Sequence, residues 1–215
     1  MIELYDNGHG IDTAGKCSPD MRLREYKKAR ELVNDIVLTR RIMGYDARIL
    51  VPEDKDVSLQ ERVRRVNEIC KQYGTENVIV VSIHCNAAGA DGKWKTAGGW
   101  CVYTSPGQTK ADKLATCLYE SAQVALKDYI DKFQANKQRG AYDSKQKPMR
   151  TDYSDKDPDY EANFYILTKT KCPAVLTENL FQDNKADVDF LISKEGHEAI
   201  VKLHVDGVDK YIKSL

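Results

Sequence analysis

Residues 77–83 have the sequence NVIVVSI and are followed directly by His84. Five of these seven side chains are β-branched aliphatics, which is typical of a strand buried on both faces. Such strands belong to parallel sheets that carry helices on both sides. The run is also far shorter than the ~20 apolar residues that a membrane-spanning helix needs. It therefore predicts an α/β protein without a membrane span.

The segments around this strand alternate between predicted strands and predicted helices. Apolar runs predict strands at residues 1–6, 46–51, 77–83, 100–104, 164–167 and 174–177. Helical periodicity predicts helices at residues 21–43, 110–129 and 196–212, and a further one that opens at the capping box Ser58 and Glu61. The alternation predicts a mostly parallel, twisted sheet of about six strands with helices on both faces.

The chain length predicts one domain, residues 1–215. Residues 143–160 interrupt the alternation, because they contain two prolines and only one aliphatic-like side chain, Met149. A segment of that length without regular structure predicts a long loop insertion. Two interpretations remain open: a solvated surface excursion, or a loop that grips a substrate.

The composition narrows the class of protein. The chain is 41% hydrophobic and 31% charged, as expected of a soluble globular protein. Its 33 basic and 33 acidic side chains balance, which argues against a nucleic-acid binder because phosphate neutralisation requires a basic excess. The first residues show no signal peptide, so we expect the chain to be made in the cytoplasm. None of the six cysteines forms a Cys-x-x-Cys pair, which predicts free thiols.

Two histidines follow two predicted strands. His9 lies in DNGHG, residues 6–10, and His84 ends the buried strand. Ligands of open α/β sheets bind outside the carboxyl ends of the strands, so these two side chains can converge there. The alternative is that each histidine forms only local hydrogen bonds at the end of its strand.

A buried carboxylate adds a third candidate. The apolar stripe of the first long helix runs through Ala29, Leu32 and Ile36, and one turn before Ala29 it reaches Glu25. A buried carboxylate needs a cation or several donors. A salt bridge to Arg22 or Arg24 would provide one, and a metal ion shared with the two histidines would provide another.

Two histidines and one glutamate are a suitable ligand set for Zn²⁺, since a three-ligand site leaves a fourth position for water. Hydrolysis then requires a general base near that water. Glu178 ends the predicted strand 174–177 at the same edge of the sheet and is the best candidate. The remaining histidines, His197 and His204, lie two turns apart on one helix, too far apart to share one metal ion.

In these residues the chain resembles the zinc-dependent N-acetylmuramoyl-L-alanine amidases of the type-3 class, which cut peptidoglycan. The resemblance rests on DNGHG at 6–10, Glu25, SIHCNA at 82–87, and PAVLTE at 173–178 followed by Asn184. It departs from the family at Asn7, where proline is frequent, at Ile11, where glycine is frequent, and at Cys85, where alanine is frequent. None of these departures removes a candidate ligand.

The resemblance implies zinc held by His9, Glu25 and His84, with Glu178 as catalytic acid and base. It also implies a six-stranded sheet flanked by helices. The reaction would be hydrolysis of the amide between N-acetylmuramic acid and L-alanine, in cell-wall lysis or remodelling by an endolysin or autolysin. We expect a monomer that acts on the cell wall, either as a phage lysin released through a pore or as a secreted enzyme without its signal. Asp6 is a candidate to orient His9.

Two rival interpretations remain. A zinc carboxypeptidase or aminopeptidase of related fold would use similar ligands, with Arg139 or Arg150 as a clamp for a terminal carboxylate. A non-catalytic module that binds the cell wall would need no general base, so the presence of Glu178 argues against it.

Overall fold

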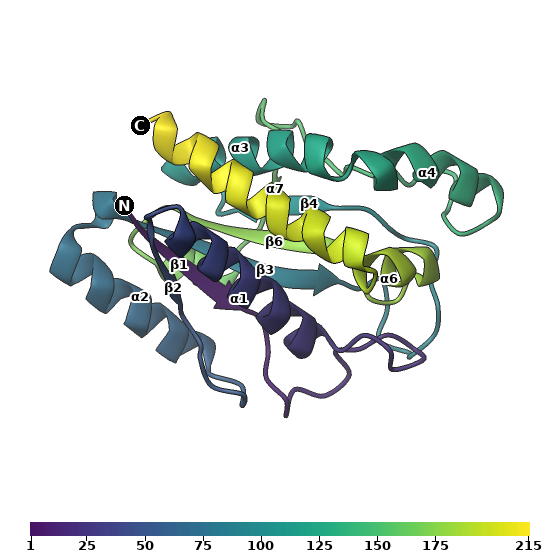
Figure 1. Cartoon of the computed structure of the whole chain (residues 1–215), viewed down its shortest axis with the longest axis horizontal. Coiled ribbons are helices and arrows are strands. Elements are labelled where there is room, and N and C mark those ends of the chain that lie inside the picture. Colours follow the sequence, from purple (N-terminus) through teal and green to yellow (C-terminus); the bar gives the residue numbers. More distant parts are fainter.

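The computed structural model describes residues 1–215 and contains one six-stranded sheet with helices on both faces (Figure 1). The strands lie in the order β2-β1-β3-β6-β4-β5. They are β1 (Ile2–Asn7), β2 (Asp46–Ile49), β3 (Val78–Asn86), β4 (Cys101–Thr104), β5 (Tyr160–Glu161) and β6 (Ala174–Phe181). All pairs are parallel except β4 and β6. The predicted α/β fold with a mostly parallel sheet is therefore confirmed.

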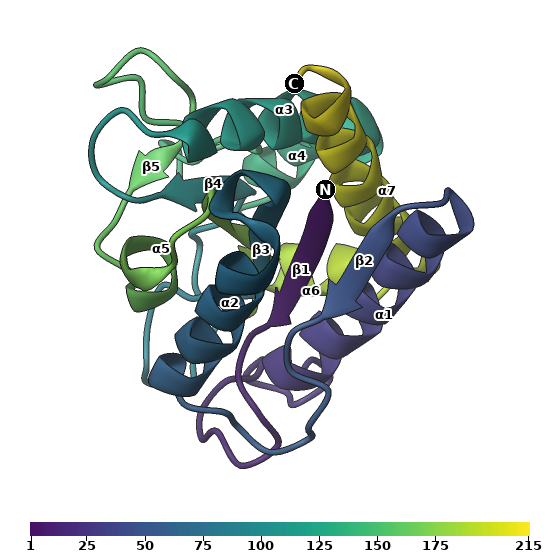
Figure 2. The same ribbon diagram turned by 90° about the vertical axis from the view of Figure 1, so that its left-hand side faces the viewer.

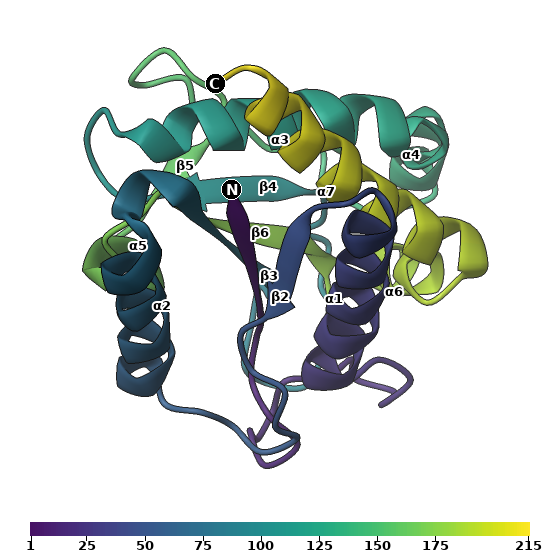
Figure 3. The ribbon, with the colours of Figure 1, turned by 60° about the vertical axis from the view of Figure 1, so that its left-hand side comes forward.

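Seven helices cover the sheet. They are α1 (Glu25–Ile42), α2 (Leu59–Tyr73), α3 (Lys110–Ala125), α4 (Lys127–Gln138), α5 (Tyr165–Lys169), α6 (Lys185–Leu191) and α7 (Lys194–Lys213). Figures 2 and 3 show α2 and α5 on one face of the sheet, with α1 and α7 on the other. None of the seven helices combines the length with the hydropathy of a membrane-spanning segment.

Strand β3 supplies side chains to both layers of the core, which explains its sequence. Val78 and Val80 pack into the smaller apolar cluster, beneath α2 and α5. Ile79, Val81 and Ile83 pack into the larger cluster, beneath α1, α3 and α7. Because successive side chains of a strand point to opposite faces, a strand between two helical layers must be apolar at almost every position.

The prediction of a strand at residues 164–167 is wrong, because this segment begins the short helix α5. Ile166 and Leu167 are adjacent in sequence and both are buried in the cluster beneath α2. A strand would send neighbouring side chains to opposite faces, whereas a helix can direct both toward one partner. The position next to α2 therefore overrides the β-propensity of the aromatic and branched side chains.

Other boundaries also differ from the predictions. The first long helix begins at Glu25 instead of Met21, because Cys17 and Arg24 form an isolated bridge in the preceding turn. The helix predicted over 110–129 is two helices that meet at Leu126. Strand β5 and helix α6 were not predicted. Residues 143–159 contain turns, bends and one isolated bridge, between Trp100 and Met149. All six cysteines are free, as predicted.

A buried ion pair joins the sheet to α1. The Arg40 guanidinium donates to the Glu3 carboxylate through Nη2 at 2.7 Å and through Nε at 3.0 Å, and neither side chain is exposed. Replacing one member would leave an uncompensated buried charge. We expect Arg40→Met to lower the free energy of unfolding by about 3–5 kcal/mol, measured by urea denaturation.

The exposed pair of Arg48 with Asp46 provides the control. Arg48→Met should cost at most about 1 kcal/mol, because solvent screens surface pairs. The double variant Arg40→Met with Glu3→Leu should recover much of the lost stability, since both buried charges are then gone. An Arg40→Met variant as stable as Arg48→Met would contradict the prediction.

Candidate metal centre

The candidate residues meet where three neighbouring strands end. His9 follows β1, His84 lies near the end of β3, and Glu178 lies in β6. In this sheet β3 pairs with both β1 and β6, and His84 stands directly opposite Glu178 in the β3–β6 register. Side chains that are opposite in register point to the same face. The topology therefore places His84 and Glu178 side by side.

Glu25 reaches this edge from the first turn of α1 and is 1% exposed. Its Oε1 accepts a hydrogen bond from the backbone N–H of Cys85 at 3.0 Å, and its Oε2 accepts one from Gln182 Nε2 at 3.2 Å. The alternative of a salt bridge to Arg22 is not found, because Arg22 pairs with Asp20 and Asp189 instead. The carboxylate is thus fixed in orientation before any ion arrives.

The three predicted ligands lie within reach of one ion. His9 Nε2 is 3.4 Å and His84 Nδ1 is 3.1 Å from Glu25 Oε1. The two imidazole rings are perpendicular, with centroids 5.1 Å apart, and the ligand atoms of all three residues lie within 4.8 Å of one another. Nitrogen and oxygen atoms that share a zinc ion at ~2.0–2.2 Å have comparable separations. The donor set and its spacing therefore fit a divalent metal ion.

The charges of the triad also favour a cation at this point. Burial works to raise the pKa of Glu25, but hydrogen bonds from His84 and His9 outweigh it and hold that pKa well below its usual range. Burial works to lower the pKa of His84, but its bond to Glu25 outweighs burial and raises it. In both cases the carboxylate stabilises positive charge between the three side chains. A bound metal ion would balance the negative charge of Glu25 without protonation of either histidine.

Glu178 has the environment of a catalytic acid and base. Its Oε2 is enclosed and has no hydrogen-bond partner in the protein. Burial raises the pKa of Glu178 to about 7, against the opposing charge of His84. A carboxyl group with a pKa near neutrality can both accept and return a proton at that pH. Its free oxygen is available to a substrate or a water molecule.

The loop that carries His9 has an uncommon backbone. His9 itself adopts a φ of 61°, a left-handed conformation that is uncommon for a non-glycine residue. Gly8 leaves room for the His84 ring, since a Cβ at Gly8 would lie 2.3 Å from that imidazole. The carbonyl of His9 accepts from Arg30 Nη1 at 2.9 Å. Close backbone approach and this hydrogen bond together hold the imidazole in place.

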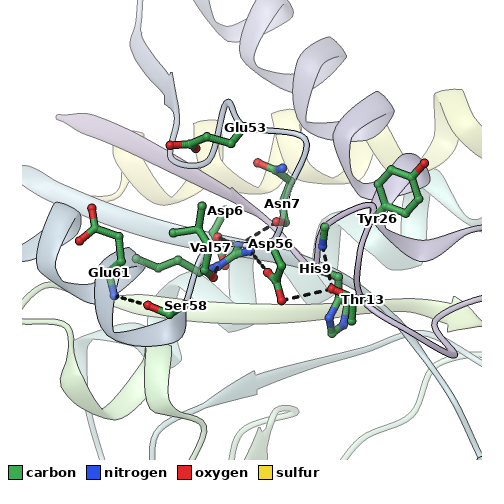
Figure 4. A network of polar contacts seen from close by, with 12 residues as sticks. Asp6, Asn7, His9, Thr13, Tyr26, Glu53, Asp56, Val57, Ser58 and Glu61 are labelled. Atoms are coloured by element: carbon green, nitrogen blue, oxygen red, sulfur yellow. Dashed lines mark hydrogen bonds and ion pairs between the residues drawn. The ribbon is translucent and has the colours of Figure 1, made fainter.

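Arg62 of α2 forms hydrogen bonds with the residues that precede His9, and its side chain is fully buried. It donates to the Asp6 carboxylate, to the carbonyl of Asn7 at 2.8 Å and to Asp56 Oδ1 at 2.8 Å. Figure 4 shows this network beside His9. Asp6 also accepts from Ser82 Oγ at 2.6 Å. Asp6 bonds to Arg62 and Ser82 and not to His9, so the prediction that Asp6 orients His9 as a hydrogen-bond acceptor is wrong.

A bulge in β6 brings a further residue to the site. The register with β3 shifts after the His84–Glu178 pair, and Leu180 adopts a φ of 66°. Bulges of this kind redirect the chain next to functional sites. Here the redirected chain allows Gln182, which is 2% exposed, to donate to Glu25. Nothing in the sequence pattern predicted this contact.

A cavity of about 410 Å³ opens over these residues. Its lining includes His9, His84 and Glu178, together with Tyr165 of α5. This volume lies in the range of small-molecule binding sites. The cavity can therefore hold part of a substrate directly against the two histidines and Glu178.

The other predicted candidates lie elsewhere. His204 is buried between Thr177 and the carbonyl of Ile200, and burial lowers its pKa to about 4. His197 contacts Asp35 on the face that α7 shares with α1. Arg139 and Arg150, the candidate clamps for a terminal carboxylate, do not line the cavity.

Known proteins resemble this chain in sequence. Residues 4–210 match the Amidase_3 family model, described as N-acetylmuramoyl-L-alanine amidase. The chain is 22% identical to N-acetylmuramoyl-L-alanine amidase CwlM of Bacillus licheniformis, over 97% of this chain and 68% of that protein. It is also 22% identical to the sporulation-specific N-acetylmuramoyl-L-alanine amidase of Bacillus subtilis, over 98% of this chain and 68% of that protein.

Solved structures show the same fold. The N-acetylmuramoyl-L-alanine amidase from Clostridium difficile 630 superposes with a TM-score of 0.73 at 20% identity, over 99% of this chain and 97% of that one. The catalytic domain of CwlV from Bacillus (Paenibacillus) polymyxa superposes with a TM-score of 0.71 at 16% identity, over 99% and 98%. At these identities the likeness concerns the arrangement of strands and helices.

Proposed function

Because the chain belongs to the N-acetylmuramoyl-L-alanine amidases of the Amidase_3 family, we propose that it cuts peptidoglycan as a zinc enzyme. The bond hydrolysed is the amide between the lactyl group of N-acetylmuramic acid and L-alanine of the stem peptide. His9, Glu25 and His84 hold the zinc ion, and Glu178 is the general acid and base. We further propose that residues 1–215 act as one catalytic domain on the cell wall.

One observation carries this proposal. Three side chains of zinc-ligand type lie within 4.8 Å of one another, and an enclosed carboxyl oxygen without a partner lies beside them. Imidazole and carboxylate ligands suit zinc. A bound zinc ion would supply Lewis acidity, which polarises the amide carbonyl and lowers the pKa of water.

The side chains of the site have separate roles in the hydrolysis. Glu25 and the two histidines would hold the ion beside Glu178. Glu178 takes the proton of the attacking water on its free carboxyl oxygen. It then gives that proton to the departing amine of L-alanine, which leaves as a neutral group. The cavity that His9, His84 and Glu178 line together would hold the amide next to all three side chains.

Digestion of purified peptidoglycan tests the proposal. We expect the protein to release new L-alanine amino termini and free lactyl carboxyl groups of muramic acid. A chelator should abolish the release, and added zinc should restore it, because the ligands remain in place. Release of single amino acids would instead indicate an exopeptidase, and sedimentation with the wall without cleavage would indicate a binding module.

A further inference from the structure

Lys16 is a cation of the catalytic cavity without a partner. The cavity lining contains two cationic side chains, Lys16 and Arg62. The guanidinium of Arg62 already donates hydrogen bonds to Asp6, to Asp56 and to two backbone carbonyls. The ammonium group of Lys16 forms no hydrogen bond or ion pair in the protein, although its side chain is partly buried. A half-buried unpaired cation in a binding cavity is a site for an anionic group of the ligand.

The backbone holds Lys16 in place. Its carbonyl accepts a hydrogen bond from the N–H of Glu25 at 2.9 Å. The next residue, Cys17, forms an antiparallel bridge with Arg24, and the N–H of Ser18 donates to the carbonyl of Leu23 at 2.9 Å. Residues 16–25 therefore form a narrow hairpin that ends on a candidate metal ligand. Lys16 is anchored to the same point of the fold as Glu25.

The charge of Lys16 acts on the reacting end of the cavity. Burial raises the pKa of Glu178, and Lys16 is one of the two side chains whose charge opposes that rise. Lys16 and Glu178 line the same cavity. A ligand group held by Lys16 would lie near the hydrolysed bond, within a cavity of about 410 Å³.

We propose that Lys16 is a specificity-determining residue that pairs with a carboxylate of the stem peptide, on the residue that follows L-alanine. This inference rests on the proposed function. Consecutive residues are 3.8 Å apart, so that carboxylate lies within roughly 7–8 Å of the hydrolysed amide. The second stem residue is a glutamate linked through its side chain. Its α-carboxyl group is free in some cell walls and amidated in others, and Lys16 selects the free form.

Two soluble substrates test the pairing. They are muramyl tripeptides that are identical except for D-isoglutamate or D-isoglutamine at the second position, and kcat and KM are measured for each. Lys16→Gln should lower kcat/KM on the D-isoglutamate substrate by about 10–100-fold, the range for losing a hydrogen bond to a charged group. The loss should fall mainly on KM, because the contact is present before the transition state. The D-isoglutamine substrate should be almost unaffected.

Two further variants separate recognition from stability and from net charge. Lys16→Arg keeps a cation and should keep the preference for D-isoglutamate. Lys27→Gln removes an exposed charge on α1 that does not line the cavity, and both substrates should be cleaved as by the unmodified protein. The unmodified protein should itself prefer D-isoglutamate.

An equal loss on both substrates in Lys16→Gln would overturn the inference, and so would equal cleavage of the two substrates by the unmodified protein. Both results would leave the proposed function intact. If the unmodified, zinc-loaded protein cleaves neither substrate between muramic acid and L-alanine, the proposed function fails and the inference falls with it.

Discussion

Glu178→Gln is expected to lower kcat by about 10²–10⁴-fold, the usual contribution of a general acid or base. Glutamine preserves the shape of the side chain but cannot take a proton from water or return one to the leaving amine. Because Glu178 is not among the three converging ligands, the variant should bind one zinc ion per chain and keep its melting temperature. Turnover on peptidoglycan, zinc content and thermal unfolding are the three measurements.

Glu195→Gln gives a matched control, because Glu195 is exposed on α7 and far from the cavity lining. It should retain full turnover. A Glu178→Gln protein that carries zinc and turns over at the unmodified rate would show that another group moves the proton. Loss of zinc in that variant would instead make Glu178 a ligand.

His84→Ala is expected to lose the metal as well as the activity. Apparent zinc binding in structural sites amounts to about 10–16 kcal/mol shared by four ligands, so one missing ligand should weaken affinity by roughly 10²–10³-fold. Zinc content after dialysis against a weak chelator measures the loss. The fold should persist, because Glu25 keeps its hydrogen bonds to Cys85 and Gln182.

His197→Gln is the histidine control, since His197 pairs with Asp35 away from the triad. It should retain zinc and turnover. A His84→Ala protein that still holds one tightly bound zinc ion would remove His84 from the ligand set and leave the proposed site without support.

The sequence was sufficient to predict the central strand and the residues at its end. An unbroken β-branched run has few alternatives to a strand between two helical layers, and His84 directly follows that run. The ends of parallel strands share an edge, which brings His9, His84 and Glu178 together before any side chain is placed. Glu25 followed from helical periodicity, because its burial is a property of the stripe that continues through Ala29.

The other contacts of the site cannot be predicted from the spacing of apolar residues in the sequence. Gln182 reaches Glu25 only because β6 bulges at Leu180, and Lys16 enters the cavity only because its hairpin returns to the start of α1. Arg62 lies on the face of α2 that carries apolar residues, where an arginine is uncommon. Each position is fixed by distant partners and not by neighbours in sequence.

The bounds of the helices could likewise be predicted only in part from the sequence. No glycine or proline marks the junction of α3 and α4 at Leu126, which is fully buried. The direction of α4 is set instead by Tyr129 and Phe133, which pack in the large core. Helix α5 was mistaken for a strand because a run of four apolar residues is too short for its period to be measured.

The lengths of the outermost strands bear on how the protein behaves at high concentration. Strand β2 at one side of the sheet has four residues, and β5 at the other has two. Long, open side strands are templates for intermolecular pairing, and very short ones leave few free backbone groups to recruit another chain. The short outer strands therefore disfavour amyloid-like self-association during refolding.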